Sequence, residues 1–185
     1  MLNEVIQETK DRMVKSLRAF ENEMTKVRTG RASTNLLDGV KVDYYGAETP
    51  LDQMASVSVP ESRLLTIKPW DLSVINDVER AILKANLGLT PSNDGKIIRI
   101  SIPPLTEDRR KEIVKATSKV CEDFKVAIRN IRRDSNDNLK DLQKQGDISE
   151  DDNFKGQKIV QDLTDENIKQ LDKIFSEKEK EILEV

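Results

Sequence analysis

The chain has 185 residues and a formal net charge of -3, and 35% of its residues are charged. It contains no histidine and a single cysteine, Cys121. This excludes a histidine general base, a catalytic histidine pair, an internal disulfide and a zinc site built from cysteines. The sequence also has no Gly-rich phosphate loop of the Walker type. We therefore expect a protein that is not an enzyme and holds neither a metal nor a cofactor.

No segment approaches the ~18 consecutive apolar residues that a membrane span requires. The first residues, 1–13, form an amphipathic pattern that includes acids, unlike a signal or transit peptide. We expect a cytoplasmic protein with no membrane contact, and we interpret Cys121 as a small buried helix residue rather than a reactive thiol.

Apolar residues near the N-terminus are spaced alternately by four and three positions, which is the heptad pattern of a packed helix. They are Met13, Leu17, Phe20, Met24 and Val27. The spacing predicts a helix from about Leu2 to Thr29, with Gly30 as the residue that ends it.

The period then changes from helical to alternating, which is typical of strands. Strands are predicted around residues 40–44, 57–59, 65–67 and 98–102, with a break at 45–50. A short helix is expected at about 73–87, ended by Gly88. Asn93-Asp94-Gly95 predicts a turn, and Pro103-Pro104 stops the last strand.

Two long helices are predicted in the C-terminal part of the chain. Thr106 is a good N-cap for a helix that continues to about Gln145, where Gly146 ends it. Ser149, followed by three acids, begins the next helix. A single helix with one apolar face must bury that face against partners, so the three long helices are expected to form one bundle.

The predicted fold class is α+β, with two domains. Residues 1–30 and 105–185 form the three-helix bundle, and residues 31–104 form an inserted β/α/β domain. Only two chain segments join them, near 29–31 and 102–105. A Gly-containing and a Pro-Pro segment together favour a hinge with restricted freedom, formed by Gly30, Arg31, Pro103 and Pro104.

The second long helix shows a separation of apolar and basic residues. At about 100° per residue, one side carries Val120, Phe124, Ala127, Ile131 and Asn138. The opposite side is expected to carry Lys111, Lys115, Lys125, Arg129, Arg132, Arg133 and Lys140. Such a stripe of cations on an acidic protein predicts a polyanion-binding surface, most simply for RNA backbone.

Each candidate also has a structural interpretation. The stripe could be a solvated helix face, and Arg28 and Arg31 could interact with a helix C-terminus. Tyr44 and Tyr45 alternate in a strand, so one is expected in the core and one exposed, and a structural role is favoured for both. Glu150, Asp151 and Asp152 resemble a carboxylate cluster, but a helix N-terminus explains them. A helical-bundle chaperone or scaffold that binds protein partners is the alternative function.

Five motifs resemble one known family. They are Arg28-Thr-Gly-Arg-Ala-Ser33, Val42-Asp-Tyr-Tyr-Gly46, Asn93-Asp-Gly95, Ile102-Pro-Pro-Leu-Thr-Glu-Asp-Arg-Arg-Lys111 and Arg129-Asn-Ile-Arg-Arg-Asp134. Collinear over essentially the whole chain, they are similar to those of the bacterial ribosome recycling factor family. Asp108 stands where the family usually has Glu, and Thr34 where Pro is common; both are mild departures.

The resemblance implies an L-shaped ribosome-binding factor. A monomer is expected because the basic stripe of the long second helix opposes self-association. The resemblance implies that the protein acts after translation termination with the GTPase elongation factor G, separating the ribosomal subunits so that messenger RNA and deacylated transfer RNA leave. It further implies that the bundle contacts large-subunit ribosomal RNA. The matching positions are Arg28, Arg31, Arg110, Arg129, Arg132 and Arg133, with Arg132 the foremost.

Overall fold

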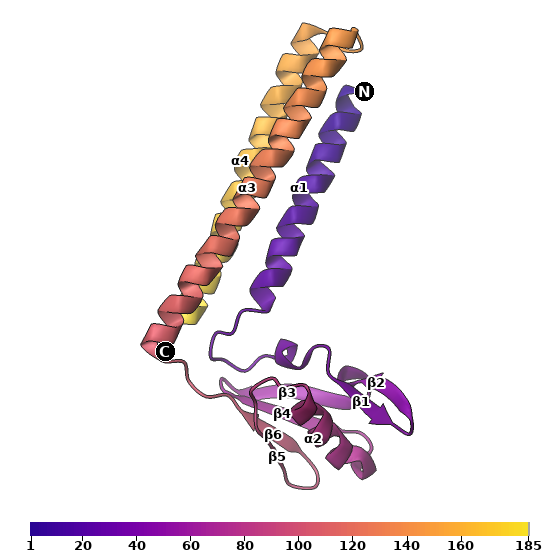
Figure 1. Ribbon diagram of the computed structural model, residues 1–185, viewed down its shortest axis with the longest axis vertical. Coiled ribbons are helices and arrows are strands. Elements are labelled where there is room, and N and C mark those ends of the chain that lie inside the picture. Colours follow the sequence, from indigo (N-terminus) through magenta and orange to yellow (C-terminus); the bar gives the residue numbers. More distant parts are fainter. Residues whose placement is uncertain (185) are drawn as a thin grey trace. The chain divides into compact units, whose positions relative to one another are not determined.

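The computed structural model describes residues 1–184, which divide into two compact units (Figure 1). One unit joins Met1–Val27 to the chain from Asp108 onward, and the other is Arg28–Glu107. None of the helices in this described part of the chain carries an apolar run long enough to span a bilayer.

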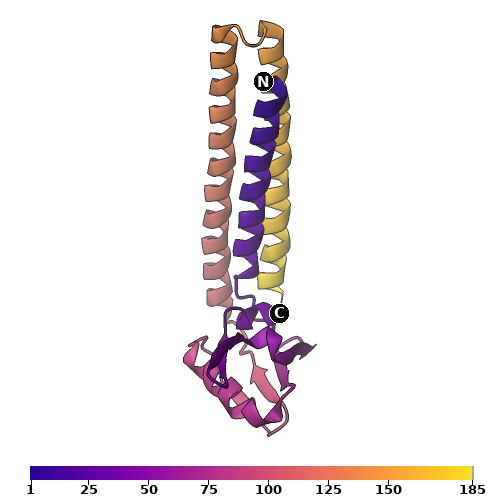
Figure 2. The same cartoon turned by 90° about the vertical axis from the view of Figure 1, so that its right-hand side faces the viewer.

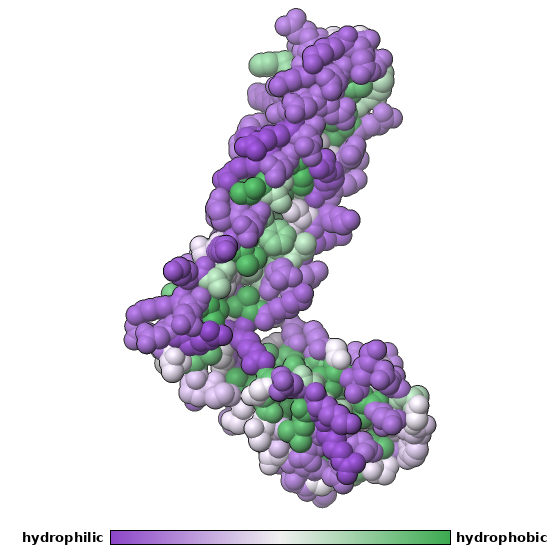
Figure 3. All heavy atoms as spheres, in the orientation of Figure 1, coloured by the Kyte–Doolittle hydropathy of each residue, from purple (hydrophilic) through white to green (hydrophobic). Residues whose placement is uncertain are grey.

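The first unit contains three long helices that run alongside one another (Figures 1 and 2). They are α1 (Leu2–Thr25), α3 (Glu107–Gln145) and α4 (Glu150–Leu183). Hydrophilic atoms cover most of the visible face of this unit, and hydrophobic atoms show mainly along the lines where helices meet (Figure 3). This pattern is that of helices that each bury one stripe.

The heptad residues of α1 form part of the core. Met13, Phe20 and Met24 are buried with Ile128 of α3 and Leu171 of α4, whereas Leu17 and Val27 are partly buried against the same cluster. A second cluster contains Val5, Leu139, Ile148 and Val160. The prediction of a three-helix bundle from one-sided apolar stripes is therefore confirmed.

Helix α1 ends four residues before the predicted Thr29, at Thr25, and its C-cap is Lys26. Gly30 has a left-handed backbone (φ +77°), but it lies beyond the cap, so the prediction that it ends the helix was wrong. The physical reason is competition from the second unit. The Arg28 guanidinium donates to the Leu87 carbonyl and the Ala32 N–H donates to the Ser62 carbonyl, which draws this segment out of a helical path.

Helices α3 and α4 begin and end close to the predicted residues. Helix α3 ends at Gln145, and Gly146 is left-handed (φ +84°). At the start of α4, Ser149 Oγ accepts a hydrogen bond from the Asp152 N–H at 3.1 Å, and the Asp152 carboxylate accepts one from the Ser149 N–H at 3.4 Å. This reciprocal capping satisfies donors that the first turn leaves unpaired.

The helices of the bundle approach closely at Gly156 of α4. A Cβ atom built there would lie 2.8 Å from Leu2 Cδ1 and 3.0 Å from Leu139 Cδ1. Leu139 is fully buried, so it has little space into which to move. The glycine therefore permits α4 to pack against both neighbours.

We expect Gly156→Val to lower the free energy of unfolding by about 1–3 kcal/mol, the usual cost of overpacking a dense core. Chemical denaturation followed by circular dichroism would measure it. Gly156→Ala is the matched control. Alanine clashes with Leu2 less than valine does, and its higher helix propensity than that of glycine, worth about 1 kcal/mol, offsets this clash. Equal stability of the valine variant and the parent would contradict the close approach.

The second unit is built from antiparallel strands and one helix. Its elements are β1 (Lys41–Tyr44), β2 (Ala47–Pro50), β3 (Ala55–Glu61), β4 (Leu64–Pro69), α2 (Ile75–Lys84), β5 (Pro91–Asn93) and β6 (Ile98–Ser101), with short 3₁₀ helices at Thr34–Leu37, Leu51–Gln53 and Leu72–Val74. Four strands pair in the order β3-β4-β6-β5, and β1 pairs with β2 in a separate hairpin.

The core of this unit is formed by alternating strand residues and one face of α2. Leu65 and Ile67 of β4 and Ile98 and Ile100 of β6 are fully buried, and Val78 of α2 belongs to the same cluster. The predicted α+β class with a small inserted β-containing segment is confirmed. The pairs β1–β2, β3–β4, β4–β6 and β5–β6 are all antiparallel.

Two local predictions for this unit were wrong, and one strand was missed. Residues 45–50 do not break the chain: Tyr45 (φ +49°) and Gly46 (φ +84°) make a two-residue turn, and β2 follows. Strand β5, only three residues long, was not predicted. Helix α2 ends at Lys84 rather than 87, and Asn86 (φ +50°) is the first left-handed residue after it.

Asp94 holds the turn between β5 and β6. Its carboxylate accepts hydrogen bonds from the N–H groups of Ile97 at 2.8 Å and Lys96 at 2.9 Å, and from Arg99 Nη1 at 2.6 Å. These bonds, the backbone ones first, lower the pKa of Asp94 from 3.8 to about 2. The charged form of this side chain is therefore the one that the fold stabilises.

We expect Asp94→Asn to lower thermal stability at neutral pH. Because the folded-state pKa is depressed, this stabilisation is present above about pH 3.8 and is lost as the pH falls through about 2. Melting temperatures of parent and variant across this range should therefore converge at the acid end. Asp38→Asn, at an exposed position of the same unit, is the control. A difference that stays constant with pH would show that the carboxylate charge is not responsible.

Candidate nucleic-acid interface

The buried stripe of α3 differs from the one that the sequence predicted. Its buried residues are Thr117, Cys121, Ile128, Ile131, Ser135 and Leu139. Asn138 is exposed, and Val120, Phe124 and Ala127 are only partly buried. The predicted stripe left out the apolar residues Ile128 and Leu139 as well as the polar residues Thr117 and Ser135. Ser135 belongs in the core because its hydroxyl pairs with that of Thr9 in α1 at 2.7 Å.

The buried stripe of α3 is therefore turned about the helix axis relative to the predicted stripe, and this changes where the cations lie relative to the core. At about 100° per residue they lie along one edge of α3 rather than opposite its buried stripe. This edge of α3 faces α4, as two contacts show: Lys125 Nζ lies 2.6 Å from Asp172 Oδ1, and Arg132 Nη1 donates to Gln161 Oε1 at 3.1 Å. The expectation of a basic stripe opposite the apolar one was therefore wrong.

We call this edge the basic flank and define it as Lys125, Arg129, Arg132, Arg133 and Lys140. The other edge of α3 faces α1, where Asp134 Oδ2 lies 2.8 Å from Arg12 Nη2. One acid, Glu122, lies within the basic flank and pairs with Arg129 and Lys125. The basic flank and Asp134 thus face different neighbouring helices. The basic flank is a directional cationic surface on a protein of net negative charge.

The three arginines of the basic flank keep donors for a ligand. Arg129 Nη1 contacts Glu122 Oε1 at 3.1 Å, and Arg133 Nη1 contacts Asn130 Oδ1 at 3.3 Å. A guanidinium has five N–H donors in a planar fork that fits two phosphate oxygens. Each of these contacts occupies only part of that fork, so all three side chains can bind phosphate.

Lys125 has a different role from the arginines. Its side chain is only 19% exposed and pairs with Asp172. This hydrogen bond, the largest cause, raises the pKa of Lys125 above its ordinary value of 10.5. Lys125 therefore holds α3 to α4. Neither Asp172 nor Gln161 was singled out from the sequence, because no pattern within α4 shows which residues of α3 they face.

Arg110 does not join the basic flank. It is partly buried, and its helical position continues the line of Thr117, Cys121 and Ile128. It lies roughly 33 Å along the helix from Arg132, at 1.5 Å per residue. Its Nε is buried without a hydrogen-bond partner among the described residues.

Arg28 and Arg31 belong to the second unit, whereas the basic flank belongs to the first. Arg28 donates a hydrogen bond to the Leu87 carbonyl, just beyond the C-terminal end of α2. Arg28 therefore has a structural role near a helix C-terminus, but the helix is α2 and not α1. Arg31 is exposed.

The residues expected to form a hinge lie in two segments that touch. A Cβ atom at Gly30 would lie 3.2 Å from Leu105 Cγ, and the left-handed backbone of Gly30 disfavours any side chain. Pro103 and Pro104 are exposed, and they follow Ile102, whose N–H donates to the Arg63 carbonyl at 2.8 Å.

Other candidates have local explanations. Asp152 caps α4, and Asp151 pairs with Lys155 at 2.5 Å. In residues 1–184 no group of three or more acids and cysteines is placed to hold a metal ion. Burial, the largest cause, raises the pKa of the Cys121 thiol, as expected for a structural cysteine.

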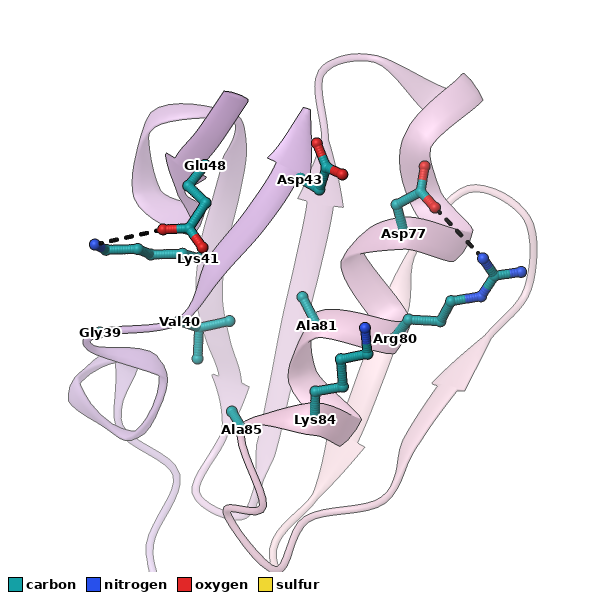
Figure 4. A pocket seen from close by; sticks show the side chains of 10 residues that line it. All are labelled: Gly39, Val40, Lys41, Asp43, Glu48, Asp77, Arg80, Ala81, Lys84 and Ala85. Carbon is teal, nitrogen blue, oxygen red and sulfur yellow. Dashed lines mark ion pairs between the residues drawn. The ribbon is translucent and has the colours of Figure 1, made fainter. Parts of the chain in front are cut away.

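The second unit contains an open groove of about 480 Å³ between β1 and α2 (Figure 4). Val40, Ala81 and Ala85 lie toward one end and the acids Asp43 and Asp77 toward the other. Two ion pairs flank it, Lys41–Glu48 at 3.9 Å and Asp77–Arg80 at 3.7 Å. None of the six arginines predicted to bind RNA lines this groove.

A bundle with a basic flank and an inserted α/β unit defines a helix-rich α+β protein suited to binding a polyanion. The profile of one family, described as ribosome recycling factor, matches residues 20–183. The chain belongs to the ribosome recycling factor family, as the five motifs had indicated.

Individual relatives agree with this assignment. The chain is 69% identical to the ribosome-recycling factor of Desulforapulum autotrophicum and 54% identical to that of Bacillus subtilis, with 100% of each chain covered in both cases. Among solved structures, a ribosome recycling factor in solution matches with a TM-score of 0.80 and 37% identity, covering 100% of this chain and 98% of that one.

A second solved structure has a TM-score of 0.66 and 44% identity, with both chains covered completely. It is the T. thermophilus ribosome recycling factor, described together with the E. coli elongation factor G bound to the E. coli post-termination complex.

Proposed function

We propose that this chain binds the post-termination ribosome through large-subunit ribosomal RNA and that the basic flank of α3 is the main contact. Ribosome recycling is the function of its family. With elongation factor G, which hydrolyses GTP, the protein separates the subunits so that messenger RNA and deacylated transfer RNA leave. The observation that carries the RNA contact is the row of Arg129, Arg132 and Arg133, each with donors available.

The chemistry of the flank favours folded RNA over unpaired bases. Guanidinium groups recognise phosphate in pairs of hydrogen bonds. Stacking on unpaired bases needs aromatic side chains, and only 4% of this chain is aromatic. Recognition of an RNA helix by its backbone and shape therefore suits these residues.

We propose that Arg129, Arg132 and Arg133 make direct phosphate contacts, and that Arg110, Arg28 and Arg31 contribute at the periphery. The protein itself is proposed to be a cytoplasmic monomer without catalytic activity, since GTP hydrolysis belongs to the partner. Residues 1–30 and 105–185 would bind RNA, and residues 31–104 would act as a lever. The compact units, which divide after Val27 and after Glu107, support that assignment of roles.

Sedimentation with separated ribosomal subunits tests the RNA contact. We expect binding to the large subunit, and an affinity that falls steeply with salt because phosphate contacts release counterions. Binding that is insensitive to salt, or binding to unfolded proteins instead of ribosomes, would favour the alternative of a chaperone or scaffold.

The lever proposal predicts a separate phenotype for the linking segments. Replacing Pro103 and Pro104 together by Gly adds backbone freedom where the chain leaves the second unit. We expect subunit splitting by elongation factor G to slow several-fold, because motion of the lever would be less directed, while ribosome binding stays unchanged. Splitting rate and binding affinity, measured side by side, check this.

Pro60→Gly is the matched control, since it removes an exposed proline from β3 of the same unit. If the double glycine variant splits ribosomes at the parental rate, the rigidity of the segment at Pro103 and Pro104 does not contribute to subunit splitting.

A further inference from the structure

The four-stranded sheet of the second unit has one covered face and one open face. Helix α2 lies across the covered face (Figure 1), where Leu65 and Ile67 of β4 are fully buried in the cluster that contains Val78. The side chains that alternate with these point to the opposite side. They include Ser56, Ser58, Thr66, Lys68 and Arg99, which are exposed except for the half-buried Thr66. We call these five residues and Trp70 the outer sheet face.

The strand register places these side chains next to one another. Ser56 pairs with Lys68, and Thr66 pairs with Ser58 on one side and with Arg99 on the other. The hydroxyl oxygens of Ser58 and Thr66 lie 2.6 Å apart. Directly paired residues of antiparallel strands have their Cβ atoms about 5 Å apart on the same side of the sheet. The outer sheet face is therefore one continuous surface.

Trp70 stands at one corner of this surface. Its N–H donates to the Met54 carbonyl at 3.1 Å, which continues the pairing of β3 with β4 by one residue beyond Pro69. Because Pro69 is buried and Lys68 is exposed, the alternation puts Trp70 on the same side as Lys68. The Trp70 side chain is 68% exposed, so its ring adds little to the core and is open to a ligand.

The outer sheet face carries positive charge close to the tryptophan. Lys68 has no ion pair with any of residues 1–184. Arg99 Nη1 lies 2.6 Å from Asp94 Oδ2, and this contact occupies only part of the guanidinium. Glu61, which also lies on this side of the sheet, is at the opposite end of β3, roughly 20 Å from the tryptophan at 3.3 Å per residue.

This combination of groups matches unpaired RNA. A base stacks on an exposed aromatic ring, cations bind the adjoining phosphates, and hydroxyls bond to phosphate and ribose oxygens. A protein partner is disfavoured, because the centre of a protein interface is depleted of charge, and the neighbours of Trp70 on the sheet are Lys68 and Ser56. Asp71, the next residue, directs its carboxylate to Ser73 N–H at 2.9 Å and Ser73 Oγ at 2.6 Å.

We propose that the outer sheet face binds an unpaired segment of ribosomal RNA, with one base stacked on Trp70 and the adjoining phosphates bound by Lys68 and Arg99. This inference rests on the proposed function, in which the basic flank of α3 binds ribosomal RNA. A protein held there meets unpaired loops of the same RNA at a high effective concentration, so a weak second contact becomes occupied. The basic flank then recognises helical RNA, and the outer sheet face recognises unpaired RNA.

Fluorescence of Trp70, the single tryptophan of the chain, reports directly on stacking. An oligouridine of about ten nucleotides, titrated into the full-length protein at low salt, is expected to quench this fluorescence, whereas an RNA duplex of equal length leaves it unchanged. Lys68→Gln should raise the oligouridine concentration that gives half-maximal quenching about tenfold, as for loss of one hydrogen bond to a charged group. Lys84→Gln is the matched control, since Lys84 is exposed on α2 of the same unit and lies outside the outer sheet face.

Vacant ribosomes, which carry no messenger RNA, test the source of the unpaired RNA. We expect Trp70→Ala to lower the affinity for them about tenfold, as for loss of one stacked base, with little change in melting temperature. Trp70→Phe, which keeps an aromatic ring, should lose much less affinity.

Three results would overturn the proposal. They are absence of quenching by oligouridine, equal quenching of Lys68→Gln and the parent, and unchanged affinity of Trp70→Ala for vacant ribosomes, which would assign the face to messenger RNA or to a protein. If Arg132→Ala binds the large subunit like the parent, the contact made by the basic flank fails instead. The two failures are therefore distinguishable.

Discussion

Arg132→Ala should weaken binding to the large ribosomal subunit by about 1.5–3 kcal/mol, the scale of hydrogen bonds to a charged group. Arg132 lies near the middle of the basic flank, and Gln161 occupies only one edge of its guanidinium. The logarithm of affinity should also depend less steeply on the logarithm of salt concentration, by about one phosphate contact. Titration of labelled protein with large subunits at several salt concentrations would measure both effects.

Gln161→Ala provides the matched control for this variant. It removes the partner of Arg132 on α4 but leaves the guanidinium in place, so RNA binding should be unchanged. Both variants lose the same internal hydrogen bond, worth about 0.5–1.5 kcal/mol of folding stability. If Arg132→Ala unfolds much earlier than Gln161→Ala, or if both bind equally well, Arg132 serves the bundle and not the RNA.

Phe20→Ala should lower the free energy of unfolding of the helical unit by about 3–5 kcal/mol, the range for deleting a buried aromatic ring. Phe20 is fully buried, and its ring centroid lies 5.3 Å from that of Phe124. Loss of the ring therefore leaves a cavity between α1 and α3, in the cluster that also holds Ile128 and Leu171.

The single tryptophan makes this prediction specific to one unit. Trp70 belongs to Arg28–Glu107, so its fluorescence reports on that unit, whereas circular dichroism reports mainly on the long helices. We expect the circular dichroism transition of Phe20→Ala to move to lower denaturant and the fluorescence transition to stay. Equal movement of both transitions would show that the two units unfold as one. Leu17→Ala, at a partly buried heptad position, should have a smaller effect.

The helices could be predicted from the sequence because their signals are local. The heptad residues from Met13 to Met24 and the capping residues around Ser149 each act within a few turns of chain. The buried face of α3 was predicted only in part. Ile128 and Leu139 are apolar and were left out of the predicted stripe, whereas Ser135 is buried by a hydrogen bond to Thr9, which is 126 positions away. The spacing of apolar residues along one helix does not predict a buried hydrogen bond between polar side chains of two different helices.

The candidate RNA-binding site could likewise be located along the chain but not oriented from the sequence, and its role stays a prediction. The motif around Arg129, Arg132 and Arg133 identifies the stretch of α3 that we propose to bind RNA, but its orientation toward α4 follows from Gln161 and Asp172, which only the packing identifies. Arg28 shows the opposite case. It lies in a recognisable motif, yet its guanidinium donates to the Leu87 carbonyl, and no local pattern predicts that these two segments are close.

The contact between Gly30 and Leu105 has a consequence for how the chain is organised. It brings the two ends of the segment 28–107 next to each other, so this segment is an inserted domain whose N- and C-terminal ends are adjacent. Joining its two ends by a short linker would give a self-contained polypeptide, and opening it at an exposed turn such as Tyr45-Gly46 would give a permuted one. The two units are thus separable modules, each able to vary without changing the connectivity of the other.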